Sequence, residues 1–385
     1  MKNAVRNIAE GRMCWEKKMR KGWLYMTVLA MSLALTGCGG EKNFQEETTD
    51  SKENTEVSQE VIEGDSVSVL TGLPISEEIS NSRPLAVMLN NIEAGCPQSG
   101  IADAAIVYEA PVEGRITRLM ALYDDYRNLE KVGSIRSSRD YFVYFAMEYD
   151  AIYAHFGQAT PYVGDLLNSD KVDNISGAVA GIKRPATNTF YDDQNRKAPH
   201  QKYLNSERLL KDIKKFDYRT ELRDDYTAKF QFGDGLTESN LEYAEDASVM
   251  YPGGKTADKT NGFSYVKAKF EYKEEDGLYY RYQYGGEHID ELTGEQLAYS
   301  NVIFQYCHGE VRDAHDYLAF GCHGNEKRMI RVFTQGKMIP GVWSRMSDEE
   351  PASYIDYNGE PIVLSPGKTW ICIIWDEYRD DVVYE

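Results

Sequence analysis

Positively charged residues are scarce in this chain of 385 residues. It contains 43 lysine and arginine residues against 62 aspartate and glutamate residues, so its formal net charge is −19 at pH 7. An acidic surface repels nucleic-acid phosphates and the headgroups of anionic membranes. We therefore expect no nucleic-acid partner and no general adhesion to anionic membranes. One basic pocket within an acidic surface is still compatible with this charge.

Known catalytic and cofactor motifs are also lacking. The chain has no GxSxG nucleophile motif, no P-loop, no dinucleotide-binding fingerprint and no paired-carboxylate signature of a glycosidase. One group, Cys307-His308 with His315 and Cys322-His323, invites a zinc interpretation. It lacks the spacing of known zinc sites, because adjacent residues of a strand point to opposite faces. We expect no cofactor and no metal, and whether the protein is an enzyme stays open.

Cysteine is too rare for a disulfide framework. The chain has six cysteines, and four of them lie beyond residue 38. Small secreted domains that depend on disulfides carry many more in a shorter sequence. A single bridge between Cys307 and Cys322 is an alternative that the sequence leaves open.

The long apolar run nearest the N-terminus, at 23–35, is too short for a membrane span and suits a secretory signal. A basic segment at 19–21 precedes it, and Leu-Thr-Gly-Cys at 35–38 ends it. This ending resembles a bacterial lipobox, which implies cleavage before Cys38 and a diacylglyceryl group on its sulfur. We therefore predict a lipoprotein signal peptide at 1–38 and a lipid anchor on the outer face of the cell membrane. The alternative is a chance cysteine after a transmembrane helix.

The segment that follows, 39–66, is rich in acids and poor in apolar residues. Between residues 41 and 66 it holds nine acids and two lysines. Such a composition cannot bury enough apolar surface to offset the entropy of ordering. We predict a disordered acidic tether that holds the folded body away from the membrane.

Residues 67–225 are expected to form an α/β-like domain with a mixed sheet. Four apolar runs are typical of buried strands: 84–91, 104–109, 118–123 and 151–156. Helical patterns begin near residues 139, 160 and 206, and serine or threonine at these points can cap them. We expect Ser137 or Ser138 to cap the first of these helices. Strands that alternate with helices favour this fold class.

Ligands of such sheets gather beyond the carboxyl ends of the strands. That rule, together with an Arg-x-x-Arg stretch at a helix N-terminus, predicts an anion site. The candidate ligand-binding residues are Asn91, Glu109, Arg118, Arg136, Ser137, Arg139, His155, Arg196 and His200. The alternative is structural: the arginines pair with Asp103, Glu109 or Glu113, and the histidines are core or surface residues.

Several motifs carry a family resemblance. They are RP at 83–84, NN at 90–91, PQSG at 97–100, YE at 108–109, GSIRS at 133–137, YDAIYAH at 149–155, RKAPH at 196–200, GVW at 341–343 and PGKTWI at 366–371. Together they resemble the YerB-like bacterial lipoproteins, a family with N- and C-terminal domains of unknown function. The resemblance covers nearly the whole mature body, and it implies architecture and location but no chemistry. Arg115 departs from it, because the family pattern has glycine there.

Residues 226–385 are expected to form an antiparallel all-β domain. The hydrophobic period switches to two, and strands are predicted at 263–272, 278–284, 301–306, 328–334, 338–344 and 369–375. Gly-containing turns separate several of them. The two-domain architecture is therefore α+β overall.

Two functions remain open. The favoured one is a membrane-anchored lipoprotein that binds an anionic envelope ligand or a partner protein through the N-terminal domain. The other is a hydrolase or transferase that acts on cell-wall polymer or a phosphate ester. In that case His155 or His200 would be the general acid–base, and Arg136 and Arg139 would stabilise negative charge.

Overall fold

The computed structural model describes residues 66–177, 187–256, 261–322 and 324–385. The predicted signal peptide with Cys38, and the predicted tether up to residue 65, lie outside these ranges. Among the described residues, no helix has both the length and the apolar character that crossing a membrane requires.

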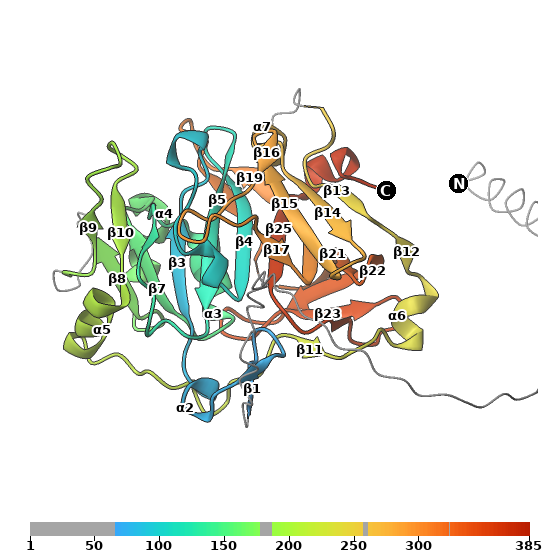
Figure 1. Ribbon diagram of the computed structural model, residues 1–385, viewed down its shortest axis with the longest axis horizontal. Coiled ribbons are helices and arrows are strands. Elements are labelled where there is room, and N and C mark those ends of the chain that lie inside the picture. Colours follow the sequence, from blue (N-terminus) through green and yellow to red (C-terminus); the bar gives the residue numbers. More distant parts are fainter. Residues whose placement is uncertain (1–65, 178–186, 257–260, 323) are drawn as a thin grey trace, which may run out of the picture. The chain divides into compact units, whose positions relative to one another are not determined.

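The largest element of the described part is an eleven-stranded mixed sheet (Figure 1). Its strands, in spatial order, are β12 (Glu245–Asp246), β22 (Lys337–Arg345), β21 (Gly324–Thr334), β18 (Asn301–Cys307), β25 (Thr369–Trp375), β4 (Ile106–Val112), β5 (Ile116–Tyr123), β3 (Leu85–Leu89), β7 (Ile152–Phe156) and β8 (Asn174–Gly177), with β23 (Ser353–Asp356) paired to β22. All four strands predicted for the N-terminal domain are therefore confirmed, with small shifts at their ends.

The remaining strands form smaller sheets. One contains β16 (Gly286–Glu287), β15 (Leu278–Gln283), β14 (Lys269–Lys273), β13 (Val249–Tyr251), β26 (Val383–Tyr384) and β17 (Ala298–Tyr299). Another contains β6 (Val132–Gly133), β10 (Lys202–Leu204) and β9 (Tyr191–Asp192). Two-stranded pairs are β1 (Ser66–Val67) with β2 (Pro74–Ile75), β11 (Gln231–Phe232) with β24 (Val363–Leu364), and β19 (Gly309–Val311) with β20 (Leu318–Phe320).

The helices are short and cover the large sheet. They are α2 (Glu77–Ser80), α3 (Asp140–Met147), α4 (Thr160–Leu167), α5 (Ser206–Lys215), α6 (Glu238–Glu242) and α7 (Gly262–Tyr265), with 3₁₀ turns η1 (Glu93–Gly95), η2 (Ile101–Asp103) and η3 (Asp376–Asp381). One apolar core includes residues of α3 and α4 on one face of the sheet. A second core includes residues of α5 and of the β13–β17 sheet on the other face.

The predicted fold class is confirmed, but some local predictions are wrong. Thr160 does not cap α4, because it is the first residue of that helix and the N-cap is Ala159, which makes no side-chain capping bond. Helix α3 begins after Arg139, whose side chain makes no capping bond, so neither Ser137 nor Ser138 caps it. The strand predicted at 263–272 starts too early, because its first residues form α7 and only β14 is extended. In α7, Asn261 accepts a hydrogen bond from the Ser264 N–H, and this cap favours a helical turn there.

One central strand joins the two halves of the sequence. β25 pairs in parallel with β18 on one side and with β4 on the other (Figure 1). Strands from residues 85–177 and from residues 245–375 therefore belong to one hydrogen-bonded sheet. Most other pairs among the C-terminal strands are antiparallel, as the alternating pattern predicted.

Two ion pairs that are fully buried also join the halves. On one face of β4, Glu109 Oε2 lies 2.9 Å from Arg281 Nη2, and both side chains are 0% exposed. On the opposite face, Lys229 Nζ lies 2.5 Å from Glu148 Oε2, again with both side chains 0% exposed. The Tyr108 hydroxyl accepts a hydrogen bond from Lys229 at 2.8 Å. Successive residues of a strand point to opposite faces. Glu109 therefore belongs to the ion pair on one face of β4, and Tyr108 contacts the ion pair on the other.

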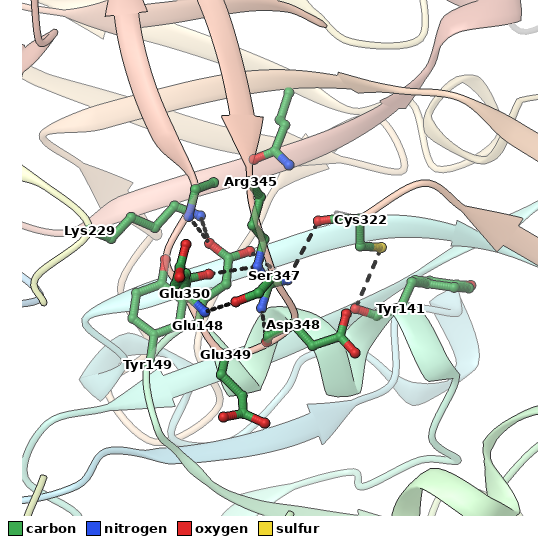
Figure 2. Close-up of polar contacts among 12 residues, drawn as sticks. Tyr141, Glu148, Tyr149, Lys229, Cys322, Arg345, Ser347, Asp348, Glu349 and Glu350 are labelled. Atoms are coloured by element: carbon green, nitrogen blue, oxygen red, sulfur yellow. Dashed lines mark hydrogen bonds and ion pairs between the residues drawn. The ribbon is translucent and has the colours of Figure 1, made fainter. Parts of the chain in front are cut away.

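Figure 2 shows the second pair in its surroundings. Arg345 Nη1 lies 3.5 Å from the other oxygen of Glu148, so two cations face one carboxylate. The backbone N–H of Ala352 also donates to Glu148, at 3.0 Å. Burial lowers the pKa of Lys229, and the nearby Glu148 carboxylate opposes that effect. A buried ion needs a partner of this kind to offset its loss of hydration.

We predict that Arg281→Met lowers the free energy of unfolding by about 3–5 kcal/mol, because it leaves Glu109 as a buried, uncompensated carboxylate. Urea denaturation measures this loss, and adding Glu109→Gln should restore part of it. The control is Arg127→Met, which breaks partly exposed pairs with Asp125 and Glu78 and should cost at most about 1 kcal/mol. Equal losses in both variants would contradict the prediction.

Candidate functional site

The candidate site lies at the carboxyl ends of β3 and β7, which are parallel neighbours. Residues 134–138, here called the Arg136 segment, run between these two strand ends. Asn90, just after β3, donates its N–H to the Ser134 carbonyl at 2.9 Å. On the other side, Phe156 of β7 donates its N–H to the Arg136 carbonyl at 3.0 Å. Backbone hydrogen bonds therefore fix this segment across the strand ends.

Gly157 lets the Arg136 segment approach β7 closely. Its φ of +91° lies in a region that residues with a Cβ rarely adopt. A Cβ at this position would also lie 2.4 Å from the Ser137 Oγ. Ser137 thus packs against the end of β7 and supports the segment.

Two guanidinium groups of the site have no carboxylate partner in the described part of the chain. Arg118 of β5 donates from Nη1 to the Ser137 carbonyl at 2.7 Å. Arg136 donates from Nη1 to the Pro199 carbonyl at 3.0 Å, while its Nε is buried without an acceptor. Burial lowers the pKa of both groups, and repulsion from Arg118 lowers that of Arg136 further. The pair is therefore an uncompensated positive centre.

His200 lies beside this positive centre without adding to its charge. Its Nδ1 accepts a hydrogen bond from the Asn90 amide at 2.9 Å. Burial lowers the pKa of His200, and the positive charges of Arg136 and Arg196 lower it further. Gly95 makes room for the contact, because a Cβ there would lie 1.7 Å from the Asn90 Nδ2 and 3.1 Å from the His200 Nδ1.

The His155 side chain is fully buried in the large sheet. Its Nδ1 lies 2.8 Å from the Gly157 carbonyl, which can only accept, so Nδ1 carries the proton. The side chain is 0% exposed, and its polar neighbours are the Gly157 carbonyl and the Asn174 side chain. Burial lowers the pKa of His155 to about 4, so the ring is neutral at pH 7.

Three other predicted charged residues have carboxylate or guanidinium partners. Glu109 pairs with Arg281, as described above. Arg139 binds both carboxylate oxygens of Glu113. Arg196 donates to Glu291 at 2.8 Å. Of these pairs, only Arg139–Glu113 belongs to the structural alternative that the sequence left open, and Glu109 and Arg196 have partners that it did not name.

The last predicted residue, Asn91, belongs to the interior network around Glu109. Its Nδ2 donates to Glu109 at 3.2 Å and to Thr117 at 2.8 Å. Its Oδ1 accepts from Gln98 at 3.2 Å. Asn91 therefore holds the end of β3 in place and is 1% exposed.

The geometry bears on the choice between catalysis and binding. Among the described residues, no hydrogen bond joins His155, His200 and Glu109 to one another. His155 bonds to Gly157, His200 to Asn90, and Glu109 to Arg281. A general acid–base needs a partner or a substrate within hydrogen-bond reach. Within the described residues, the arrangement therefore suits charge recognition better than proton transfer.

Sequence reasoning overlooked several residues on which the site depends. Gly95 and Gly157 provide space for it, and they appeared in the sequence only as ordinary loop glycines. Arg281, which neutralises Glu109, lies in β15. The alternating sequence of that strand predicted an ordinary strand residue at this position and gave no sign of an ion pair. The residues around Lys229 do not indicate that it is buried. It can be buried because Glu148, which is distant in the sequence, neutralises it.

The cysteines and the candidate metal ligands form no disulfide and no metal site among the described residues. The four described cysteines are free, so the alternative of a Cys307–Cys322 bridge is wrong for this structure. Among the described residues, no group of three or more histidine, cysteine and acidic side chains could hold a metal ion. Burial raises the pKa of the Cys307 thiol to about 12, so this group is a neutral core residue.

We predict that His155 destabilises the protein at acidic pH. The unfolded chain binds a proton at its ordinary pKa of 6.5, whereas the folded protein binds it only near 4. Lowering the pH from 7 to 4 should therefore cost about 3 kcal/mol through this group. Urea denaturation at both pH values should show this much less loss in His155→Gln. The exposed His308→Gln is the control, and an unchanged pH dependence in His155→Gln would contradict the prediction.

Comparisons with known proteins place the chain in a family. Residues 70–219 match the model described as the N-terminal domain of a protein of unknown function, DUF3048. Residues 260–371 match the C-terminal domain of the same family. A curated relative, "Putative lipoprotein YerB" of Bacillus subtilis, is 28% identical over 311 residues, which is 80% of this chain and 86% of the relative.

A solved structure agrees with this relationship. The crystal structure of the YerB protein from Bacillus subtilis matches with a TM-score of 0.68 and 24% sequence identity. The match covers 83% of this chain and 99% of the solved chain. The fold and the two matched domains together show that this chain is a member of the DUF3048 family.

Proposed function

We propose that the protein is a lipoprotein, anchored through Cys38 to the outer face of the cell membrane, that binds an anionic ligand of the cell envelope. The lipobox-like ending at residues 35–38 supports the anchor, and so does the name of the Bacillus subtilis relative, a putative lipoprotein. The Arg118–Arg136 pair supports the ligand. We place the binding centre at these two residues, with His200 and Asn90 beside them.

The observation that carries the proposal is the uncompensated charge of Arg118 and Arg136. Arg118 is only 5% exposed, so water hydrates it poorly. Arg118 and Arg136 each donate a hydrogen bond to a neutral backbone carbonyl. These carbonyls accept an N–H group but do not neutralise the positive charge. An anion that binds both groups would remove their mutual repulsion and give the buried Nε of Arg136 an acceptor. Arg139 and Arg196, by contrast, already have carboxylates.

The ligand class follows from the donors. A guanidinium group presents planar, paired N–H groups that match phosphate or carboxylate oxygens. A phosphate ester or a sugar acid therefore fits this centre. The predicted alternative, a hydrolase or transferase, would need His155 or His200 to approach the substrate, and neither histidine bonds a group that would activate it.

We predict that Arg136→Gln weakens binding of inorganic phosphate or of glucuronate at least tenfold. A charge-assisted hydrogen bond contributes about 1.5–3 kcal/mol, which corresponds to about tenfold or more in Kd. Isothermal titration at low salt measures the affinity. Arg127→Gln removes the same charge elsewhere and should leave binding unchanged. If native protein binds neither anion, or if Arg136→Gln lowers only the melting temperature, the arginines are structural.

We predict that Cys38→Ser releases the protein from membranes. The hydroxyl cannot accept the thioether-linked diacylglyceryl group, so the signal is not processed as a lipoprotein signal. Incorporation of labelled palmitate and fractionation of cells report the anchor. Cys96→Ser removes a half-buried thiol of the folded body and should leave labelling intact. Unchanged palmitate labelling of Cys38→Ser would refute the lipid anchor.

A further inference from the structure

A cavity lies beside the turn between β4 and β5. It has a volume of about 300 Å³, and elements from both halves of the sequence line it. These are the turn between β4 and β5, the β19–β20 pair, the start of α7 and the junction of β25 with η3. Small-molecule sites begin at about this size.

The cavity has an aromatic and apolar side. Trp375 and Tyr378 line it with their rings 5.4 Å apart and nearly perpendicular. Val311 and Leu318 line it too, and Val311 is 52% exposed. Gly309 supports Trp375 from behind, because a Cβ there would lie 2.9 Å from three atoms of the indole.

The cavity also has charged side chains without a partner. Three charged residues line it: Arg115, Asp316 and Glu377. Within the described part of the chain, none of their side chains forms a hydrogen bond or an ion pair. Glu113 differs, since Arg139 occupies its carboxylate. One guanidinium and two carboxylates can together donate and accept several hydrogen bonds.

Two of these residues have an uncommon backbone conformation. Arg115 has a φ of 60° and Asp316 a φ of 59°, which is the left-handed region. Residues with a Cβ adopt it at an energetic cost, whereas glycine does not. At both positions a side chain is therefore present where the backbone favours glycine.

We propose that this cavity binds one or two rings of a saccharide. The C–H faces of a sugar ring can pack on Trp375 and Tyr378, because aromatic rings bury apolar surface and also tolerate polar neighbours. Sugar hydroxyls both donate and accept, so they match the mixed set of Arg115, Asp316 and Glu377. The three side chains sum to one negative charge, which disfavours the anion expected at Arg118 and Arg136. The two sites are therefore chemically distinct.

The test uses tryptophan fluorescence of the intact folded body. Of the three tryptophans in the described residues, Trp343 and Trp370 are 1% and 0% exposed, so acrylamide quenching reports mainly on the half-buried Trp375. The probes are diacetylchitobiose, cellobiose and maltose. At least one should protect Trp375 from quenching in a saturable way, and inorganic phosphate should not compete. Failure of all three to bind would overturn the proposal.

Two glycine variants identify the site without disturbing the backbone. Arg115→Gly and Asp316→Gly each remove a side chain at a φ that glycine prefers, so both should fold normally. Each should weaken binding of the active saccharide at least tenfold. Asp217→Gly, at a φ of 56°, is the matched control and should bind normally. Native affinity in both Arg115→Gly and Asp316→Gly would overturn the proposal even if the saccharide binds.

Discussion

The fold depends on buried charges that each half of the sequence supplies to the other. Glu109 and Glu148 come from the first half, and Arg281 and Lys229, which neutralise them, come from the second. Loss of either partner would leave a buried ion without compensation. Because such an ion costs several kcal/mol, comparable with the whole stability of a domain, these pairs couple the stability of the two halves.

The same coupling reaches the Arg136 segment. His288, in the second half, bonds to the Gln98 side-chain oxygen at 2.8 Å, and Gln98 donates to the Asn90 carbonyl at 2.7 Å. Asn90 in turn bonds His200 and the Ser134 carbonyl. A chain of direct hydrogen bonds therefore holds the proposed anion site against the second half of the molecule. Site geometry and the integrity of both halves are linked for this reason.

Sequence patterns predicted what local physics controls. Apolar runs located β3, β4, β5 and β7, and period-two alternation located most C-terminal strands, because burial on one or two faces determines each pattern. The strand-end rule brought Arg136 and His155 to the same edge of the sheet. Helix starts were less accurate, since Arg139 rather than a serine precedes α3.

What could not be predicted depends on partners far apart in sequence. Nothing in the residues around Arg196 indicates that Glu291 pairs with it, and nothing around Glu109 names Arg281. The sequence therefore could not separate arginines with a carboxylate from Arg118 and Arg136, which have none. The parallel pairing of β25 with β4 was equally hidden, because strand patterns carry no information on which strand lies beside which.

The position of β25 has a consequence for biogenesis. This strand, at residues 369–375, comes after the other strands of the large sheet in the sequence, yet it lies in the middle of that sheet. Until it is synthesised, β4 presents an open edge, and such edges promote aggregation. The large sheet can therefore close only after all of its other strands have been synthesised.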